Sequence, residues 1–135
     1  MFLTWQPIYS VNIKEIDEQH QKIFSIINNL FEIKNNQSQA SIDLIVKELK
    51  DYGSYHLETE EKYFKLFNYP DTKFHIAQHN GYRNKVLDFE SKINESNDDI
   101  LIINELTEFL KNWWLYHIQN TDQQYSAFFN SKGLV

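Results

Sequence analysis

Histidine and acidic residues recur in this sequence at spacings that suit metal binding. His56 precedes Glu60 by four residues, and His75 precedes His79 by the same interval. Residues four apart on an α-helix differ by about 40° in direction, so both side chains of such a pair can reach one ion. Three further residues complete a set of five imidazoles and two carboxylates: His20, His56, Glu60, His75, His79, His117 and Asp122.

The two carboxylates of this set need a positive partner if they are buried. No Lys or Arg falls at an inward position of the predicted helices, where it could pair with Glu60 or Asp122. Burial of an unpaired carboxylate costs several kcal/mol. A bound cation would neutralise both groups.

The number and type of the candidate ligands indicate two metal ions. Five imidazoles and two carboxylates exceed the four ligands of a tetrahedral zinc ion, and the absence of Cys removes the usual structural zinc sites. Imidazole with carboxylate suits iron, although zinc and manganese also accept these ligands. If both carboxylates bridge two octahedral ions together with an oxo or hydroxo group, one coordination position stays open.

Apolar residues between these groups predict four helices. Only 3 Gly and 2 Pro occur in 135 residues, which is scarce for a β-rich fold. Apolar side chains recur every three or four residues over four stretches, which short polar segments separate. We expect a single domain over 1–135, with an irregular segment over 1–16, a short C-terminal segment, and helices over about 17–35, 41–67, 71–93 and 98–120.

Short connections make neighbouring helices antiparallel, so the sequence predicts an all-α, antiparallel up-down-up-down four-helix bundle. The candidate ligands place a site for two metal ions in its core. All five His fall at inward positions, early in the first and third helices and late in the second and fourth. Antiparallel packing brings these positions to one end of the bundle. We expect Asp17 to cap the first helix and Asn68, which tolerates the left-handed conformation, to end the second.

The spacing of His117 and Asp122 departs from regular helical geometry. Five residues correspond to about 140° around an ideal α-helix, so the two side chains cannot share a face. We therefore predict a local π-turn or bend between them, a feature that is frequent at functional sites.

The charge of the chain argues against nucleic-acid and membrane partners. Its 13 Lys and Arg against 19 Asp and Glu give a net charge of -6, with Arg83 as the single Arg and no Lys cluster. No apolar run approaches about 18 residues, and the N-terminus lacks a signal-like core. The absence of Cys is compatible with a reducing compartment. We expect a soluble, cytoplasmic protein.

The seven candidate ligands and their spacings resemble those of the hemerythrin family. The resemblance extends from about Trp5 to Tyr125. Three flanking sequence motifs resemble those of the family's bacterial branch: Ile16-Asp17-Glu18-Gln19-His20, Tyr69-Pro70, and Trp113 four residues before His117.

This resemblance implies two iron ions, oxo- or hydroxo-bridged, that share the carboxylates of Glu60 and Asp122. His20 and His56 would hold the five-coordinate iron, where O2 binds reversibly at the vacant position. The six-coordinate iron would be held by the remaining three imidazoles, those of His75, His79 and His117.

The resemblance further implies a protein for O2 storage, buffering or delivery that is not an enzyme. The alternative is a sensor of O2, NO or redox state, and in 135 residues we expect any output to need a separate partner protein. The partner in O2 delivery would be an oxygen-consuming enzyme, whereas the partner of a sensor would be a signalling protein. Catalysis at the same site is a third class, without an additional inward acid or base to indicate it. A metal-free interaction bundle would leave Glu60 and Asp122 unexplained.

Trp114 stands where the family commonly has Leu over the O2 pocket. We expect its ring to form a wall of this pocket and to change O2 release or autoxidation; alternatively, it packs at the edge of the bundle beside Trp113. Tyr125 lies one turn beyond Asp122 and could bond to a group that supports the ligands. Six Phe residues are expected in the core: Phe24, Phe31, Phe64, Phe67, Phe74 and Phe109.

Overall fold

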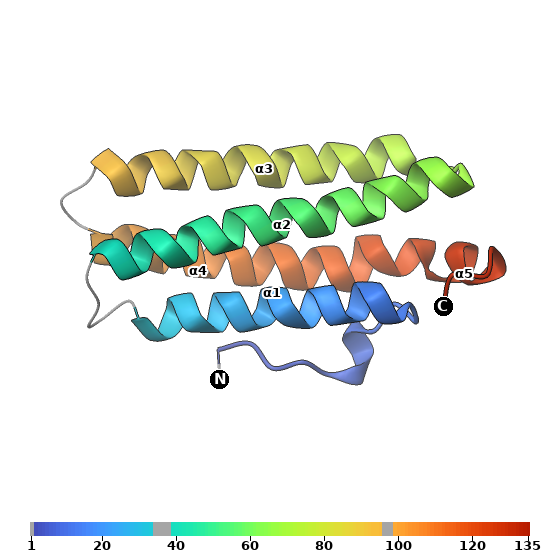
Figure 1. Ribbon diagram of the computed structural model, residues 1–135, viewed down its shortest axis with the longest axis horizontal. Helices are drawn as coiled ribbons and strands as arrows, with labels where there is room; N and C mark the ends of the chain where they lie inside the picture. The colour runs from blue at the N-terminus through green and yellow to red at the C-terminus, as the bar shows by residue number, and fades with distance from the viewer. Residues whose placement is uncertain (1, 34–38, 96–98) are drawn as a thin grey trace.

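Four long helices lie side by side in the computed structural model of the chain (Figure 1). The structure describes residues 2–33, 39–95 and 99–135. α1 packs against α2 and α4, and α3 packs against the same two helices, so the predicted all-α, antiparallel four-helix bundle is confirmed. The four helices are α1 (Lys14–Ile33), α2 (Gln39–Phe67), α3 (Thr72–Glu95) and α4 (Asp99–Tyr116).

The first helix begins at Lys14, three residues before the predicted start, because Asp17 has another role than capping. Its Oδ1 accepts a hydrogen bond from the backbone N–H of Val11 at 2.8 Å, and its Oδ2 accepts one from the Ser10 hydroxyl at 2.5 Å. Asp17 therefore lies within the first turn of α1 and fixes the chain that leads into it. The expected end of this helix near 35 and the expected start of the fourth at 98 lie outside the described residues.

A tight turn joins α2 to α3 and sets the register of the two helices. Asn68 adopts a φ of 52°, which confirms the left-handed conformation expected at the end of the second helix. The next N–H, that of Tyr69, bonds to the carbonyl of Phe64 at 3.0 Å, and the Thr72 hydroxyl donates to the Tyr69 carbonyl at 2.6 Å. This turn places the end of α2 beside the start of α3.

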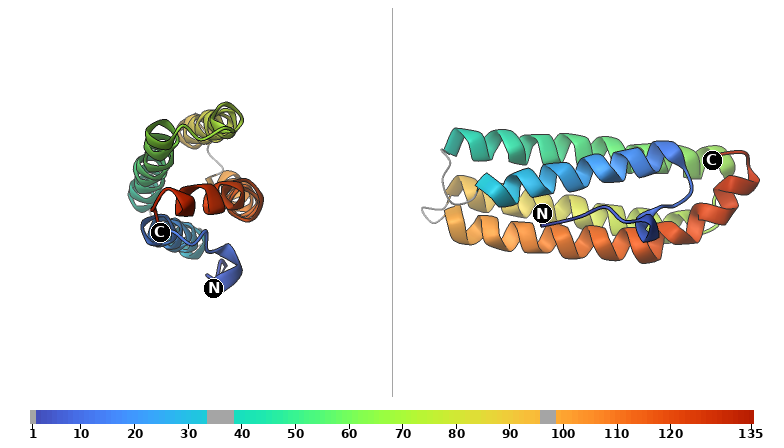
Figure 2. Two further views of the ribbon diagram at one scale, coloured as in Figure 1. Left: turned by 90° about the vertical axis from the view of Figure 1, so that its right-hand side faces the viewer. Right: turned by 90° about the horizontal axis from the view of Figure 1, so that it is seen from below.

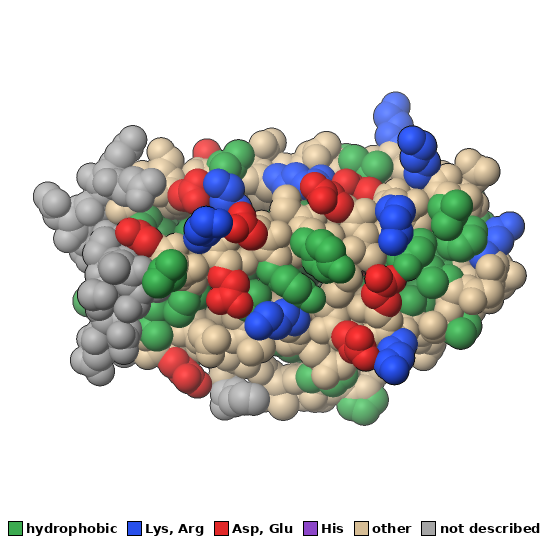
Figure 3. Space-filling view, in the orientation of Figure 1, with side chains coloured by type: hydrophobic (Ala, Val, Ile, Leu, Met, Phe, Trp, Pro, Cys, Tyr) green, Lys and Arg blue, Asp and Glu red, His purple; other side chains and the backbone are tan. Residues whose placement is uncertain are grey.

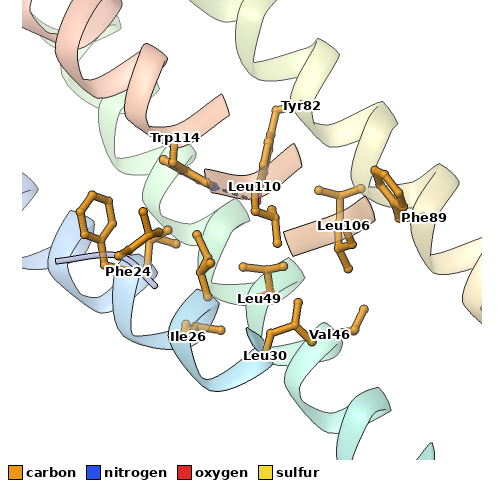
Figure 4. Close-up of a cluster of buried hydrophobic side chains, with 14 of the residues drawn as sticks. Phe24, Ile26, Leu30, Val46, Leu49, Tyr82, Phe89, Leu106, Leu110 and Trp114 are labelled. Carbon is orange, nitrogen blue, oxygen red and sulfur yellow. Dashed lines mark hydrogen bonds between the residues drawn. The ribbon is translucent and has the colours of Figure 1, made fainter. Parts of the chain in front are cut away.

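The core consists of two clusters of hydrophobic side chains. The larger cluster fills the middle of the bundle and the end that is distant from α5, and it includes Phe24, Leu49 and Leu106 (Figure 4). The smaller cluster closes the other end and includes Phe64 and Phe129. The buried His residues lie where the two clusters meet. Along α1, for example, His20 falls between Ile16 of the smaller cluster and Ile23 of the larger one.

One aromatic residue does not follow the expectation for the core. Phe74 has 58% of its surface exposed. It directly precedes His75, so it is turned by about 100° from the inward face of α3. The face in Figure 3 shows charged and apolar side chains interspersed, with no His side chain at the surface.

The C-terminal part of the chain forms more structure than the short segment expected. A π-helical segment, His117–Asp122, follows α4 directly and leads into α5 (Gln123–Ser131). α5 turns away from the axis of α4 and lies across the end of the bundle (Figure 2). Tyr125 and Phe129 on α5 are fully buried, so this helix completes the smaller core cluster.

The N-terminal residues form an arm that lies against α1. Its one helical element is a short 3-10 helix, Pro7–Tyr9. Asn28 of α1 pairs with both backbone groups of Leu3, accepting from its N–H at 2.7 Å and donating to its carbonyl at 2.8 Å. The ring of Trp5 lies 5.6 Å from that of Phe24, so the arm covers the side of α1 near the buried His residues.

Within the described residues, none of the helices combines the length and the apolar character needed to cross a membrane.

Candidate metal centre

The structure brings all seven candidate ligands together in one buried cluster. α1, α2, α3 and the π-helical segment after α4 contribute to it, and the side chains of all seven are at most 1% exposed. The ligand atoms form two groups, within each of which they lie no more than 4.8 Å apart. The first group is Glu60, His75, His79 and His117, and the second is His20, His56, Glu60 and Asp122.

Distances within the first group match the separation of ligands around one ion. His75 Nε2 lies 3.1 Å from His117 Nε2, and His79 Nε2 lies 3.1 Å from Glu60 Oε1. Two donors bound about 2.1 Å from a metal ion at right angles to each other are about 3 Å apart. The imidazole nitrogens of this group therefore converge on a point that one ion could occupy.

Asp122 connects this group with the second one through its two carboxylate oxygens. Its Oδ1 lies 2.9 Å from His75 Nε2 and 3.0 Å from His117 Nε2, whereas its Oδ2 lies 3.2 Å from His20 Nε2. A carboxylate in this position can donate one oxygen to each of two ions. The arrangement suits the bridging role that the resemblance implies for Asp122, and metal binding by these residues stays a prediction.

Glu60 is also shared by the two groups, through a different arrangement of its oxygens. Its Oε1 lies 3.1 Å from His79 Nε2 and 3.7 Å from His56 Nε2. Its Oε2 accepts a short hydrogen bond from the hydroxyl of Tyr125. Tyr125 thus fixes the orientation of this carboxylate. It contacts a candidate ligand directly, and not the supporting group that the sequence predicts.

The π-helical segment explains how His117 and Asp122 reach the same cluster. In a π-helix each backbone hydrogen bond joins residues five apart, whereas in an α-helix it joins residues four apart. Residues five apart therefore lie on the same side of a π-helix. The segment runs over His117–Asp122, with both end residues fully buried. The predicted π-turn between the two residues is confirmed.

Several polar atoms of the cluster have no hydrogen-bond partner, although buried polar atoms in proteins nearly always have one. Among them are Nε2 of His20, His56 and His79. Oε1 of Glu60 and both oxygens of Asp122 share this property. Donor atoms of this kind, aimed at a common centre, fit a bound cation better than a hydrogen-bonded core.

The pKa values in the cluster reflect the competition between burial and charge. Burial lowers the pKa of His56 to about 3, which leaves the imidazole neutral, as metal binding requires. Burial also lowers the pKa of His75, but the adjacent negative carboxylates of Asp122 and Glu60 outweigh it and raise that pKa to about 9. A proton on His75 and a metal ion are therefore alternative positive partners for the two carboxylates.

Three of the imidazoles use Nδ1 to contact a side chain outside the cluster. His56 Nδ1 lies 2.7 Å from Oε1 of Gln19, and His117 Nδ1 lies 2.9 Å from Oε1 of Gln78. His79 Nδ1 lies 2.7 Å from Oε2 of Glu61. These contacts turn Nε2 of each ring toward the cluster. The sequence alone does not identify these three partners, because they become evident only once the pairing of the helices is known.

Trp114 is fully buried beside the second group, so it does not pack at the edge of the bundle. Its ring lies 5.6 Å from that of His56 and 6.3 Å from that of His20. Its indole N–H donates to the Tyr82 hydroxyl at 3.3 Å, which holds the ring in place (Figure 4). The neighbouring Trp113 instead stacks on His117, at 4.3 Å between ring centroids.

A four-helix bundle that encloses a cluster of imidazoles and carboxylates defines the class of non-heme metal-binding bundles. The family model for the hemerythrin HHE cation binding domain matches residues 11–129 of this chain. The chain therefore belongs to the hemerythrin family, whose members are generally O2-binding di-iron proteins rather than enzymes. The buried cluster fits a non-heme iron site.

Individual relatives support this assignment over almost the whole chain. A bacteriohemerythrin from Clostridium acetobutylicum is 30% identical over 126 residues, which cover 90% of this chain and 96% of the relative. A bacteriohemerythrin from Stenotrophomonas maltophilia is 27% identical and covers 92% of this chain and 79% of its own length. The crystal structure of a wild-type hemerythrin superposes with a TM-score of 0.83 at 26% identity, covering 94% of this chain and 97% of that one.

Proposed function

We propose that this chain binds O2 reversibly at a pair of non-heme iron ions and serves in O2 storage, buffering or delivery. The observation that carries the proposal is the pair of buried ligand groups that share Glu60, with Asp122 directing one oxygen to each side. Membership of the hemerythrin family supports it independently.

The two groups give each residue a role in holding iron. His75, His79 and His117 would hold one ion, and His20 and His56 the other, with Glu60 and Asp122 shared between them. The iron pair would supply reversible electron transfer to O2. The group with two imidazoles has fewer protein donors than the group with three, so it is the side on which a small ligand has room to bind.

Residues around this second group exclude water from it. Trp114 covers His56 and His20 from the α4 side, and Trp5 of the N-terminal arm lies 6.5 Å from the His20 ring. A dry apolar wall limits the access of water and protons to bound O2, which favours release of the gas over oxidation of the iron.

The donor set also favours binding over oxidation chemistry. Five neutral imidazoles donate less charge to iron than the Glu-rich sets of ferritin-like di-iron proteins. High-valent iron and cleavage of the O–O bond are correspondingly less favoured. A carrier or buffer therefore suits this site better than an oxidase.

The test is the iron content together with the visible spectrum. Protein purified without added metal is assayed for iron per chain, then reduced, exposed to O2 and flushed with inert gas. About two irons, with a charge-transfer band that appears with O2 and fades on flushing, would support the proposal. Immediate oxidation without such a band would contradict it and favour the alternative, a sensor of O2, NO or redox state that acts through a separate protein. Sustained O2 or peroxide consumption with added reductant would indicate an enzyme.

A further inference from the structure

Glu61 connects the metal centre to the surface of the bundle. It follows Glu60 on α2, but its carboxylate points away from the two ligand groups and toward α3. Its Oε2 accepts a hydrogen bond from His79 Nδ1 at 2.7 Å. The same carboxylate binds Arg83 through both oxygens, with NH1 2.8 Å from Oε2 and NH2 3.0 Å from Oε1.

The contact with Arg83 fixes the position of this carboxylate. A fork of two parallel hydrogen bonds between guanidinium and carboxylate restrains both groups more than a single bond does. Arg83 is held in turn by Asn80, whose Oδ1 lies 3.1 Å from its NH1. Glu61 is 22% exposed at its side chain, so the ion pair lies at the rim of the bundle with one face against His79.

His79 differs in this respect from the other imidazoles with a known Nδ1 partner. His56 and His117 contact the neutral amides of Gln19 and Gln78. Among these three rings, His79 alone has a carboxylate as its partner. An Nδ1–H that donates to a carboxylate makes the opposite nitrogen a stronger donor to a metal, and such contacts also fix the tautomer and the orientation of the ring.

We propose that Glu61, clamped by Arg83, is a positioning residue that makes His79 a stronger donor to the metal than His117 and lowers the reduction potential of the iron held there. This inference rests on the proposed iron centre and adds a difference between its two halves. The half held by His79 is the one tuned toward the ferric state.

Two substitutions separate the charge of Glu61 from its hydrogen bond. Glu61→Gln keeps an acceptor oxygen for His79 and removes the charge, whereas Glu61→Ala removes both. Glu58→Gln is the matched control, because Glu58 is an exposed residue on the same helix and its substitution changes the net charge equally. Helical circular dichroism of each variant establishes that the bundle is folded.

Three measurements are made on the iron-loaded or zinc-loaded chain. Competition with a chelator gives the Fe²⁺ affinity under anaerobic conditions, a redox titration gives the potential, and nitrogen NMR of the zinc-loaded protein gives the tautomer of His79. We expect Glu61→Ala to weaken Fe²⁺ binding by about 10- to 100-fold and to disturb the tautomer. We expect Glu61→Gln to retain the tautomer, to weaken binding less and to raise the potential, while Glu58→Gln matches the wild-type chain.

The inference is overturned if Glu61→Ala binds Fe²⁺ as tightly as the wild-type chain, or if Glu58→Gln raises the potential as much as Glu61→Gln does. A wild-type chain that binds no iron would instead refute the proposed function on which the inference rests. The two failures are thus distinguished by the wild-type measurement.

Discussion

Replacement of Trp114 by Leu tests whether this ring is a wall of the O2 site. The indole is fully buried, so the substitution removes about 60 Å³ of side chain from the interior, which is room for about two water molecules at about 30 Å³ each. The space opens directly beside the ring of His56, which lies 5.6 Å from the indole. We expect faster O2 release and faster autoxidation, since water gains access to the open side of the centre.

The cost in stability follows from the same cavity. About 60 Å³ at about 24 cal/mol per Å³ corresponds to about 1.5 kcal/mol, and the lost hydrogen bond to Tyr82 adds about 1 kcal/mol. Urea unfolding of wild-type and variant chains with equal metal content should therefore show a loss of about 2–3 kcal/mol. For the reaction with O2, a tenfold faster autoxidation would correspond to an activation barrier lowered by about 1.4 kcal/mol.

Stopped-flow release of O2 and the decay of the oxygenated spectrum measure the two rates. Tyr82→Phe is the control, because it removes the partner of the indole N–H and keeps both rings in place. We expect this control to lose about 1 kcal/mol of stability with nearly unchanged rates. Unaltered rates in Trp114→Leu, despite the expected loss of stability, would refute the assignment of Trp114 as a wall of the site.

Three further predictions concern other parts of the molecule. Asp122→Asn should reduce bound iron from about two per chain to one or less, since the amide bridges poorly, and Asp88→Asn at an exposed position should leave the iron content unchanged. The second prediction concerns unfolding in acid. In the folded chain the pKa of Glu61 is lowered from 4.5 to about 2, because hydrogen bonds from His79 and Arg83 outweigh the opposing effect of burial. Its contribution to stability is present above about pH 4.5 and is lost as the pH falls toward 2, so Glu61→Gln should flatten this part of the wild-type curve, and identical curves would contradict the reasoning. Asn28→Ala should cost about 1–3 kcal/mol and expose the N-terminal arm to proteolysis, because two backbone groups of Leu3 lose their partner; equal cleavage rates would show that other contacts hold the arm.

The sequence predicts most of the bundle because its helices alternate strongly between apolar and polar faces. The spacing of His56 with Glu60 and of His75 with His79 also predicts their convergence, since four residues on a helix define one direction. Even the irregular segment after α4 follows from spacing, because His117 and Asp122 cannot meet on a regular helix.

Other features depend on contacts between helices, which a single sequence does not specify. Glu61 follows a candidate ligand in the sequence and has the character of an ordinary surface residue. Only the packing of α2 against α3 shows its contacts with His79 and Arg83. The spacing of Tyr125 and Phe129 is helical and indicates α5. A helix of 9 residues is, however, shorter than the stretch over which apolar periodicity distinguishes a helix from other structure. Asp17 suits both a helix cap and a contact within the first turn, and only the path of the preceding chain decides between them.

The extra residue in the π-helical segment makes metal binding and the closed end of the bundle depend on each other. Asp122 is the last residue of the segment, and α5 continues directly from it with Tyr125 on Glu60 and Phe129 in the smaller core cluster. Deleting one residue between His117 and Asp122 would rotate Asp122 and the whole of α5 by about 100° at once. The position of Asp122 and the docking of α5 are therefore coupled. A metal ion bound by Asp122 would also stabilise the docking of α5, and undocking of α5 would remove this ligand from the proposed iron centre.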